Sequence, residues 1–86
     1  MYQAIETKYL GPTNVRGSRV KATAEAGSVT LTWDDALNSD ANHIKAAQAL
    51  AKKYGWKGTY HGGAVHGAGG YVFVCATDAP QFTVEA

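Results

Sequence analysis

The chain has 86 residues, a formal net charge of +1 at pH 7 and a hydrophobic content of 45%. This length suits one folded domain and not two, so we expect a single domain over residues 1–86. The apolar content exceeds that of a disordered chain. The near-neutral charge excludes both a dense acidic mimic of DNA and a strongly basic nucleic-acid coat. With a single cysteine, no disulfide can form within the chain.

The sequence carries no targeting or membrane signal of the usual kind. Residues 1–6 do not combine a basic segment with an apolar run, as a signal peptide would. No stretch approaches the length of a membrane-spanning helix. We therefore expect a cytoplasmic protein without membrane association.

Alternation of apolar and polar residues predicts three strands in the first part of the chain. Residues 4–10 follow the two-residue period of a half-buried strand. Residues 18–24 and 29–33 do the same and are separated by a short turn, which predicts an antiparallel hairpin. The outer face of this hairpin would carry Arg19, Lys21, Thr23, Thr30 and Thr32.

A helix is predicted next, with Ser39 or Asp40 as its N-cap and Gly55 as its terminator. Apolar residues recur at steps of three and four, which predicts one stripe packed on the sheet. This stripe consists of Ala41, Ile44, Ala47, Leu50, Ala51 and Tyr54. The opposite side is expected to hold His43, Lys45, Gln48, Ala49 and Lys52.

Two further strands are predicted after the helix. Residues 56–61 are the weaker candidate, and residues 71–76 the stronger, because they are continuously apolar like a central strand. The glycine-rich residues 62–70 between them are predicted to form a flexible connection. The expected fold class is α+β, with an antiparallel sheet of four to five strands and one helix packed on one face. The expected element order is three strands, the helix and two strands.

Catalytic and metal-binding motifs find little support in the sequence. The glycine-rich segment precedes a strand instead of opening a helix, and it lacks a Gly-Lys-Ser/Thr ending, so a nucleotide-binding loop is disfavoured. The three histidines and Cys75 lack the paired spacing of a structural zinc site. Cys75 lies inside a predicted strand, where a thiol is usually inert. We expect no catalytic residue, no metal and no cofactor, and hence not an enzyme.

A basic segment near the N-terminus is the most informative charge feature. Between residues 8 and 23 every charged residue is cationic, and two of these cations share a predicted strand face. Such a segment can bind nucleic-acid phosphates, can meet an acidic protein surface, or can be a solvated face balanced by Glu6 and Glu25. The candidate partner-binding residues are Lys8, Asn14, Arg16, Arg19, Lys21 and His66.

The segment KYLGPTNVRGSRVKA at residues 8–22 resembles a pattern found in small uncharacterised proteins encoded by phages, plasmids and other mobile elements. Trp33-Asp34, the alanine-rich helix opened by Asn42-His43, Gly55-Trp56 and the final GGYVFV extend the resemblance over most of the chain. Such proteins are often accessory factors that block host defences, anti-CRISPR proteins among them. These inhibitors usually work by binding a host complex.

The resemblance implies a non-catalytic protein that inhibits or modulates a host defence complex in the host cytoplasm. Its partner would be a host protein or a ribonucleoprotein complex. The alternative is a small nucleic-acid-binding accessory protein that uses the face of Arg16, Arg19 and Lys21. A monomer and a homodimer are both compatible with these functions.

Overall fold

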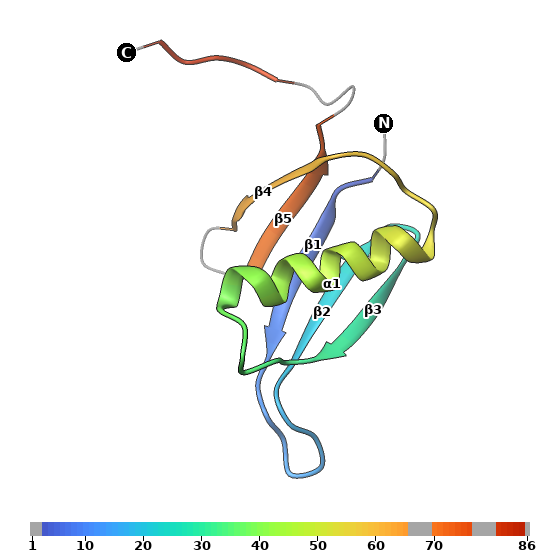
Figure 1. Cartoon of the computed structure of the whole chain (residues 1–86), viewed down its shortest axis with the longest axis vertical. Helices are drawn as coiled ribbons and strands as arrows, with labels where there is room; N and C mark the ends of the chain where they lie inside the picture. Colours follow the sequence, from blue (N-terminus) through green and yellow to red (C-terminus); the bar gives the residue numbers. More distant parts are fainter. Residues whose placement is uncertain (1–2, 66–69, 77–80, 86) are drawn as a thin grey trace.

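The computed structural model describes residues 3–65, 70–76 and 81–85. Its elements are β1 (Ile5–Leu10), β2 (Arg19–Ala24), β3 (Gly27–Thr32), α1 (Ser39–Lys53), β4 (Tyr60–Ala64) and β5 (Gly70–Cys75), as Figure 1 shows. The strands form one antiparallel sheet in the order β3-β2-β1-β5-β4. The predicted α+β class, the element order and the antiparallel sheet are confirmed, and β5 has an inner position in the sheet as predicted.

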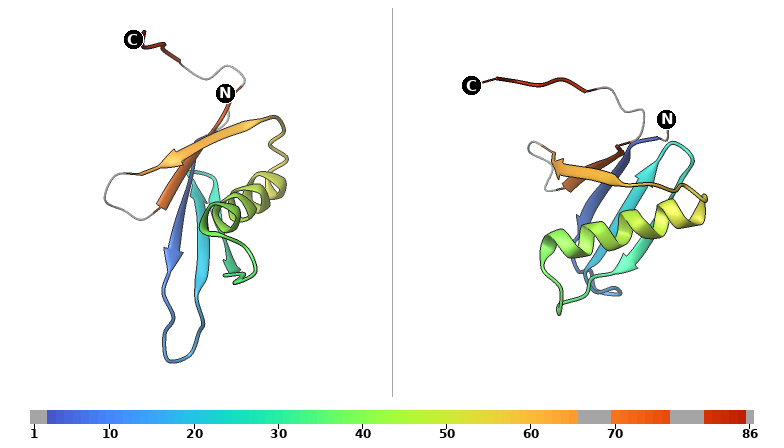
Figure 2. Two further views of the ribbon diagram at one scale, coloured as in Figure 1. Left: turned by 60° about the vertical axis from the view of Figure 1, so that its left-hand side comes forward. Right: turned by 45° about the horizontal axis from the view of Figure 1, so that its top comes forward.

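Helix α1 packs on one face of the sheet and leaves the other face uncovered (Figures 1 and 2). The core lies between these two layers. Because five of its fifteen residues are alanines with short side chains, the helix can lie close to the strands. The buried cluster consists of Ile5, Val20, Ala22, Ala46, Ala47, Leu50, Ala51 and Phe73.

The buried side of α1 differs from the predicted stripe in its first turns. Asn42 and His43 are each 1% exposed, whereas Ile44 is 46% exposed. The prediction that His43 faces solvent and Ile44 the sheet was therefore wrong. Both buried polar side chains have hydrogen-bond partners, since Asn42 binds backbone groups of the preceding loop and His43 binds Thr7. These hydrogen bonds offset the cost of burying polar groups.

The two ends of α1 are fixed by side-chain and backbone capping. The N-cap is Asn38, whose Oδ1 accepts a hydrogen bond from the Ala41 N–H at 2.8 Å, so the predicted cap at Ser39 or Asp40 was one or two residues late. Gly55 follows the helix with a φ of +69°, the left-handed conformation predicted for the terminator. In the described part of the chain, no helix has the length and apolar character needed to cross a membrane.

Part of the glycine-rich segment belongs to the sheet. The strand predicted over residues 56–61 begins only at Tyr60. The connection predicted over residues 62–70 is shorter than expected, because Gly62 still belongs to β4 and pairs with Phe73 of β5. A Cβ atom on Gly62 would lie 2.3 Å from the Phe73 ring. The glycine is therefore what allows this ring to pack against β4.

Candidate functional site

Three of the predicted binding residues share the sheet face opposite α1. Lys8 of β1 lies directly opposite Lys21 of β2, and both side chains are exposed. Arg19 lies two residues before Lys21, so strand alternation places it on the same side, where it is half-buried. We call Lys8, Arg19 and Lys21 the basic face. His66, also predicted from the sequence, lies outside the described residues.

The neighbours of the basic face neutralise little of its charge. Thr30 and Thr32 of β3 are the cross-strand partners on one side. Glu6 is the only acidic residue in β1, β2 and β3, and it pairs with Thr23, two residues along β1 from the lysine pair. The face therefore combines three cations with a single carboxylate.

Folding itself does not account for the opposed lysines. Directly opposite residues in an antiparallel pair have Cβ atoms about 4.5–5.5 Å apart, and like charges at that spacing destabilise a sheet. Lys8 and Lys21 stand in this relationship. A pairing that opposes folding is typical of a surface that serves recognition.

Asn14 and Arg16 lie away from the basic face, in the connection between β1 and β2. This connection projects beyond the sheet (Figure 1). A tight turn closes it, in which the Thr13 N–H donates to the Arg16 carbonyl at 2.7 Å and the Thr13 hydroxyl accepts from the Arg16 N–H at 3.0 Å. Val15 is 89% exposed. The structure therefore places these two predicted residues in the projecting loop, apart from the three strand cations.

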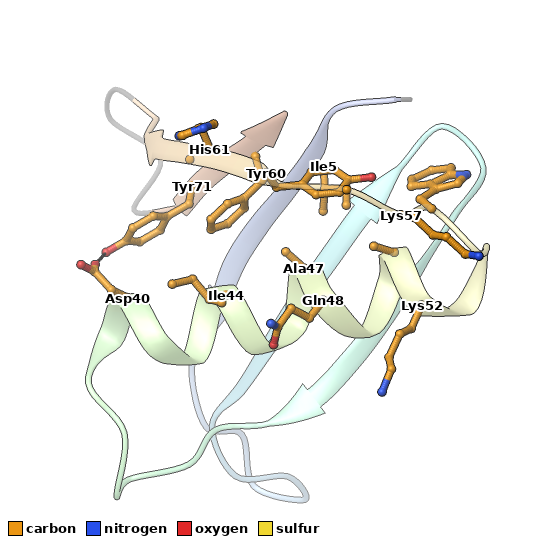
Figure 3. A pocket seen from close by; sticks show the side chains of 15 residues that line it. Ile5, Asp40, Ile44, Ala47, Gln48, Lys52, Lys57, Tyr60, His61 and Tyr71 are labelled. Carbon is orange, nitrogen blue, oxygen red and sulfur yellow. Dashed lines mark hydrogen bonds between the residues drawn. The ribbon is translucent and has the colours of Figure 1, made fainter. Parts of the chain in front are cut away.

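A groove between α1 and strands β4 and β5 is a second candidate site, which the sequence analysis missed. It has a volume of about 640 Å³, and Figure 3 shows its lining side chains. Its walls are largely aromatic, with Trp56, Tyr60, Tyr71 and Phe73. Its polar lining side chains are those of Asp40, Gln48, Lys52, Lys57 and His61. The concentration of aromatic residues after the helix was the available signal, but the position of β4 relative to α1 was not predictable from it.

A hydrogen bond between Tyr71 and Asp40 closes one end of this groove. The Tyr71 hydroxyl donates to Asp40 Oδ1, and Figure 3 shows the two side chains meeting at the start of α1. The hydrogen bond to the Asp40 carboxylate raises the pKa of Tyr71, and a hydrogen bond with Ser39 opposes this effect. Tyr71 is therefore a protonated donor that holds β5 to α1.

His43 lies in the packed layer beside Tyr71, with 4.3 Å between the two ring centroids. Its Nδ1 is 2.7 Å from Thr7 Oγ1, and its ring packs edge-on against Trp33. Burial lowers the pKa of His43, while the charge of Asp40 acts in the opposite direction. Because His43 and Thr7 are 1% and 3% exposed, the pair contributes to the fold and does not present a nucleophile and base to a ligand.

The described residues form neither a metal-binding site nor an accessible reactive thiol. Among those residues, no group of three or more His, Cys, Asp or Glu side chains could hold a metal ion. Cys75 is 3% exposed, and its Sγ lies 3.9 Å from the Lys57 carbonyl oxygen. The thiol is enclosed in the sheet, in the strand where the sequence places Cys75.

No protein-family model, no curated protein and no solved structure matches this chain. The structural observations that bear on its function are therefore the charge, shape and packing of the basic face and the aromatic groove.

Proposed function

We propose that this protein is a non-catalytic binding module whose basic face docks on an acidic surface of a partner protein. The observation that carries the proposal is the exposed, directly opposed pair Lys8 and Lys21 on the side of the sheet that α1 leaves uncovered. Arg19 extends the same positive surface. Complementary charge would steer the encounter and fix the register of the complex.

The positions of the aromatic residues favour a protein partner over single-stranded nucleic acid. Bases of single strands stack on aromatic side chains placed along a cationic groove. The aromatic residues of the five strands lie on the side of α1, where Tyr9 packs on Trp33 and Tyr60, Tyr71 and Phe73 line the groove. The basic face thus offers charge without a stacking platform.

The resemblance of residues 8–22 to a segment of small phage and plasmid proteins supports a role in countering host defence. In this proposal, the partner is a host protein or ribonucleoprotein complex of the defence system. The module inhibits or modulates that complex in the host cytoplasm by occupying part of its surface, as anti-CRISPR proteins do. Occupation of a surface requires no catalytic residue.

Nucleic-acid binding through the same face is the second candidate function. Arg16 in the projecting loop would add a fourth cation, and no carboxylate lies between residues 8 and 23. Such an array suits contacts with phosphates. Because bound phosphates release counterions, this function predicts an affinity that falls steeply with salt. A gel shift with single-stranded and duplex oligonucleotides at low and high salt would measure it.

Quantitative affinity purification from host lysate, with and without nuclease, tests both candidates. The variants are Lys8→Glu with Lys21→Glu, and the matched control Lys45→Glu, an exposed lysine on α1. Docking on a protein predicts a nuclease-resistant partner that the wild type and the control retain and the double variant loses. Loss of the partner after nuclease treatment would favour nucleic-acid binding. The same partners in all three samples would overturn the role of the basic face.

A further inference from the structure

Strand β4 lies at one edge of the sheet, and some of its backbone N–H and C=O groups point away from β5. In the described part of the chain, β4 pairs with β5 alone. Hydrogen bonds from the Val65 N–H to Gly70 and from the Ala76 N–H to Thr59 show that odd-numbered residues of this strand bind to β5. The N–H and C=O of Gly62 therefore point to the open edge. Gly62 also lines the aromatic groove, so an extended segment lying there could bond to this backbone.

The groove next to Gly62 has the chemistry to bind an apolar segment that carries a negative charge. Its aromatic walls suit a large apolar side chain. Lys52 and Lys57 lie at the end where α1 finishes, and Asp40 lies at the other end, where Tyr71 already binds it (Figure 3). A carboxylate is therefore favoured at the lysine end and disfavoured at the Asp40 end.

Residues 81–85 of this chain have the complementary character. Phe82 and Val84 are 88% and 81% exposed, so these two large apolar side chains are left almost entirely in solvent. They alternate with the polar Thr83 and Glu85, which places both apolar side chains on one side of an extended segment. Glu85 supplies a negative charge within this segment.

We propose that residues 81–85 of a second copy of this chain occupy the aromatic groove, with Phe82 between its walls and Glu85 near Lys52 and Lys57. Within one chain, the segment runs away from its own groove (Figures 1 and 2). Each copy carries both this groove and this segment, so reciprocal exchange closes a two-fold dimer. The proposal does not depend on the function proposed above, because the basic face lies on the opposite side of the sheet.

Sedimentation of the full chain over about a hundredfold range of concentration tests this exchange. One variant carries Phe82→Ser and Val84→Ser in the segment, and another carries Ile44→Asp at an exposed position of the groove. The control is Val15→Ser, which removes an exposed apolar side chain from the projecting loop. The wild type and the control should dimerise, and each of the two other variants should raise the dissociation constant at least about tenfold. Circular dichroism would verify that all variants fold.

Mixing the two defective variants tests whether the contact forms between copies. One protein supplies an intact groove and the other an intact segment, so the mixture should form a dimer that neither forms alone. Glu85→Lys should weaken association, and Lys52→Glu with Lys57→Glu in the same chain should restore it. A wild type that stays monomeric throughout would overturn the proposal. So would a dimer that survives Phe82→Ser with Val84→Ser, or a mixture that does not associate.

Discussion

Lys8 and Lys21 are direct cross-strand partners on the side of the sheet that α1 leaves uncovered. Both side chains are exposed, and the strand backbones hold their positive charges close together. In the proposed function these charges bind an acidic partner surface. Replacing either lysine with an acidic residue is therefore expected to stabilise the fold and to weaken binding of the partner.

The substitution Lys21→Glu should raise the free energy of unfolding by about 0.2–1 kcal/mol, because it replaces a like-charge pair with an opposite-charge pair. Urea denaturation at low salt would measure the change, and added salt should reduce it. Lys45→Glu is the matched control, since the residues three and four positions away on α1 are uncharged. A loss of stability in Lys21→Glu beyond that of the control would contradict the electrostatic account.

The same substitution at two asparagines should destabilise the protein at one position and leave its stability unchanged at the other. Asn42 Oδ1 accepts from the Asp34 N–H at 2.9 Å, and its Nδ2 donates to the carbonyls of Asp34 and Asn38. Asn42→Asp removes these donors and buries a carboxylate against carbonyl oxygens, so it should cost about 2 kcal/mol or more at pH 7. Asn38→Asp keeps the capping acceptor at the positive end of α1 and should preserve stability. Equal losses in thermal denaturation would argue against these assigned roles.

Neighbouring glycines in β4 should differ sharply in their tolerance of a methyl group. A Cβ on Gly62 would meet the Phe73 ring at 2.3 Å, whereas a Cβ on Gly63 would have no atom within 4 Å. Gly62→Ala should therefore lower the free energy of unfolding by about 1–3 kcal/mol through overpacking. Gly63→Ala should change it by less than about 0.5 kcal/mol. Chemical denaturation of both variants would measure the contrast, and similar values would show that Phe73 does not constrain β4.

Acid should weaken the fold through His43. Burial lowers the pKa of His43 below its ordinary value of 6.5, so the folded protein favours the neutral ring. As the pH falls below about 6.5, the unfolded chain takes up a proton that the folded chain does not, and the free energy of unfolding falls until the lowered pKa is reached. Urea denaturation between about pH 8 and about pH 5 would measure this effect.

Two histidine variants give the control for this pH dependence. His43→Leu should lose most of the dependence while leaving the buried Thr7 hydroxyl without its partner, at a cost of about 1–3 kcal/mol. His61→Gln changes an exposed side chain and should retain the dependence. A wild-type stability that stays constant across the range would show that His43 is not the responsible group.

Local sequence patterns were sufficient to predict the sheet and the helix. Alternation along residues 5–10 and 19–24 defines which side of each strand is buried, and Gly55 marks the end of α1. The rotation of α1 depends on a partner that lies far away in the chain. Thr7, which binds His43, is 36 residues from it, so the helix alone gave no reason to bury a histidine.

The two candidate surfaces differ in how far the sequence could reveal them. Alternation predicts that Arg19 and Lys21 share a face, but the direct opposition of Lys8 and Lys21 depends on the register between β1 and β2. The aromatic groove combines residues from α1, β4, β5 and their connections. Its existence depends on how far β4 lies from α1, which no local pattern encodes.

The most direct test of the basic face is a pair of measurements on Lys21→Glu. Once the nuclease-resistant partner is purified, calorimetric titration at physiological salt gives the dissociation constant, and denaturation of the same protein gives its stability. We predict that binding weakens at least about tenfold while the free energy of unfolding stays equal or rises, and that Lys45→Glu changes neither. Unchanged affinity of Lys21→Glu for the partner would contradict the account.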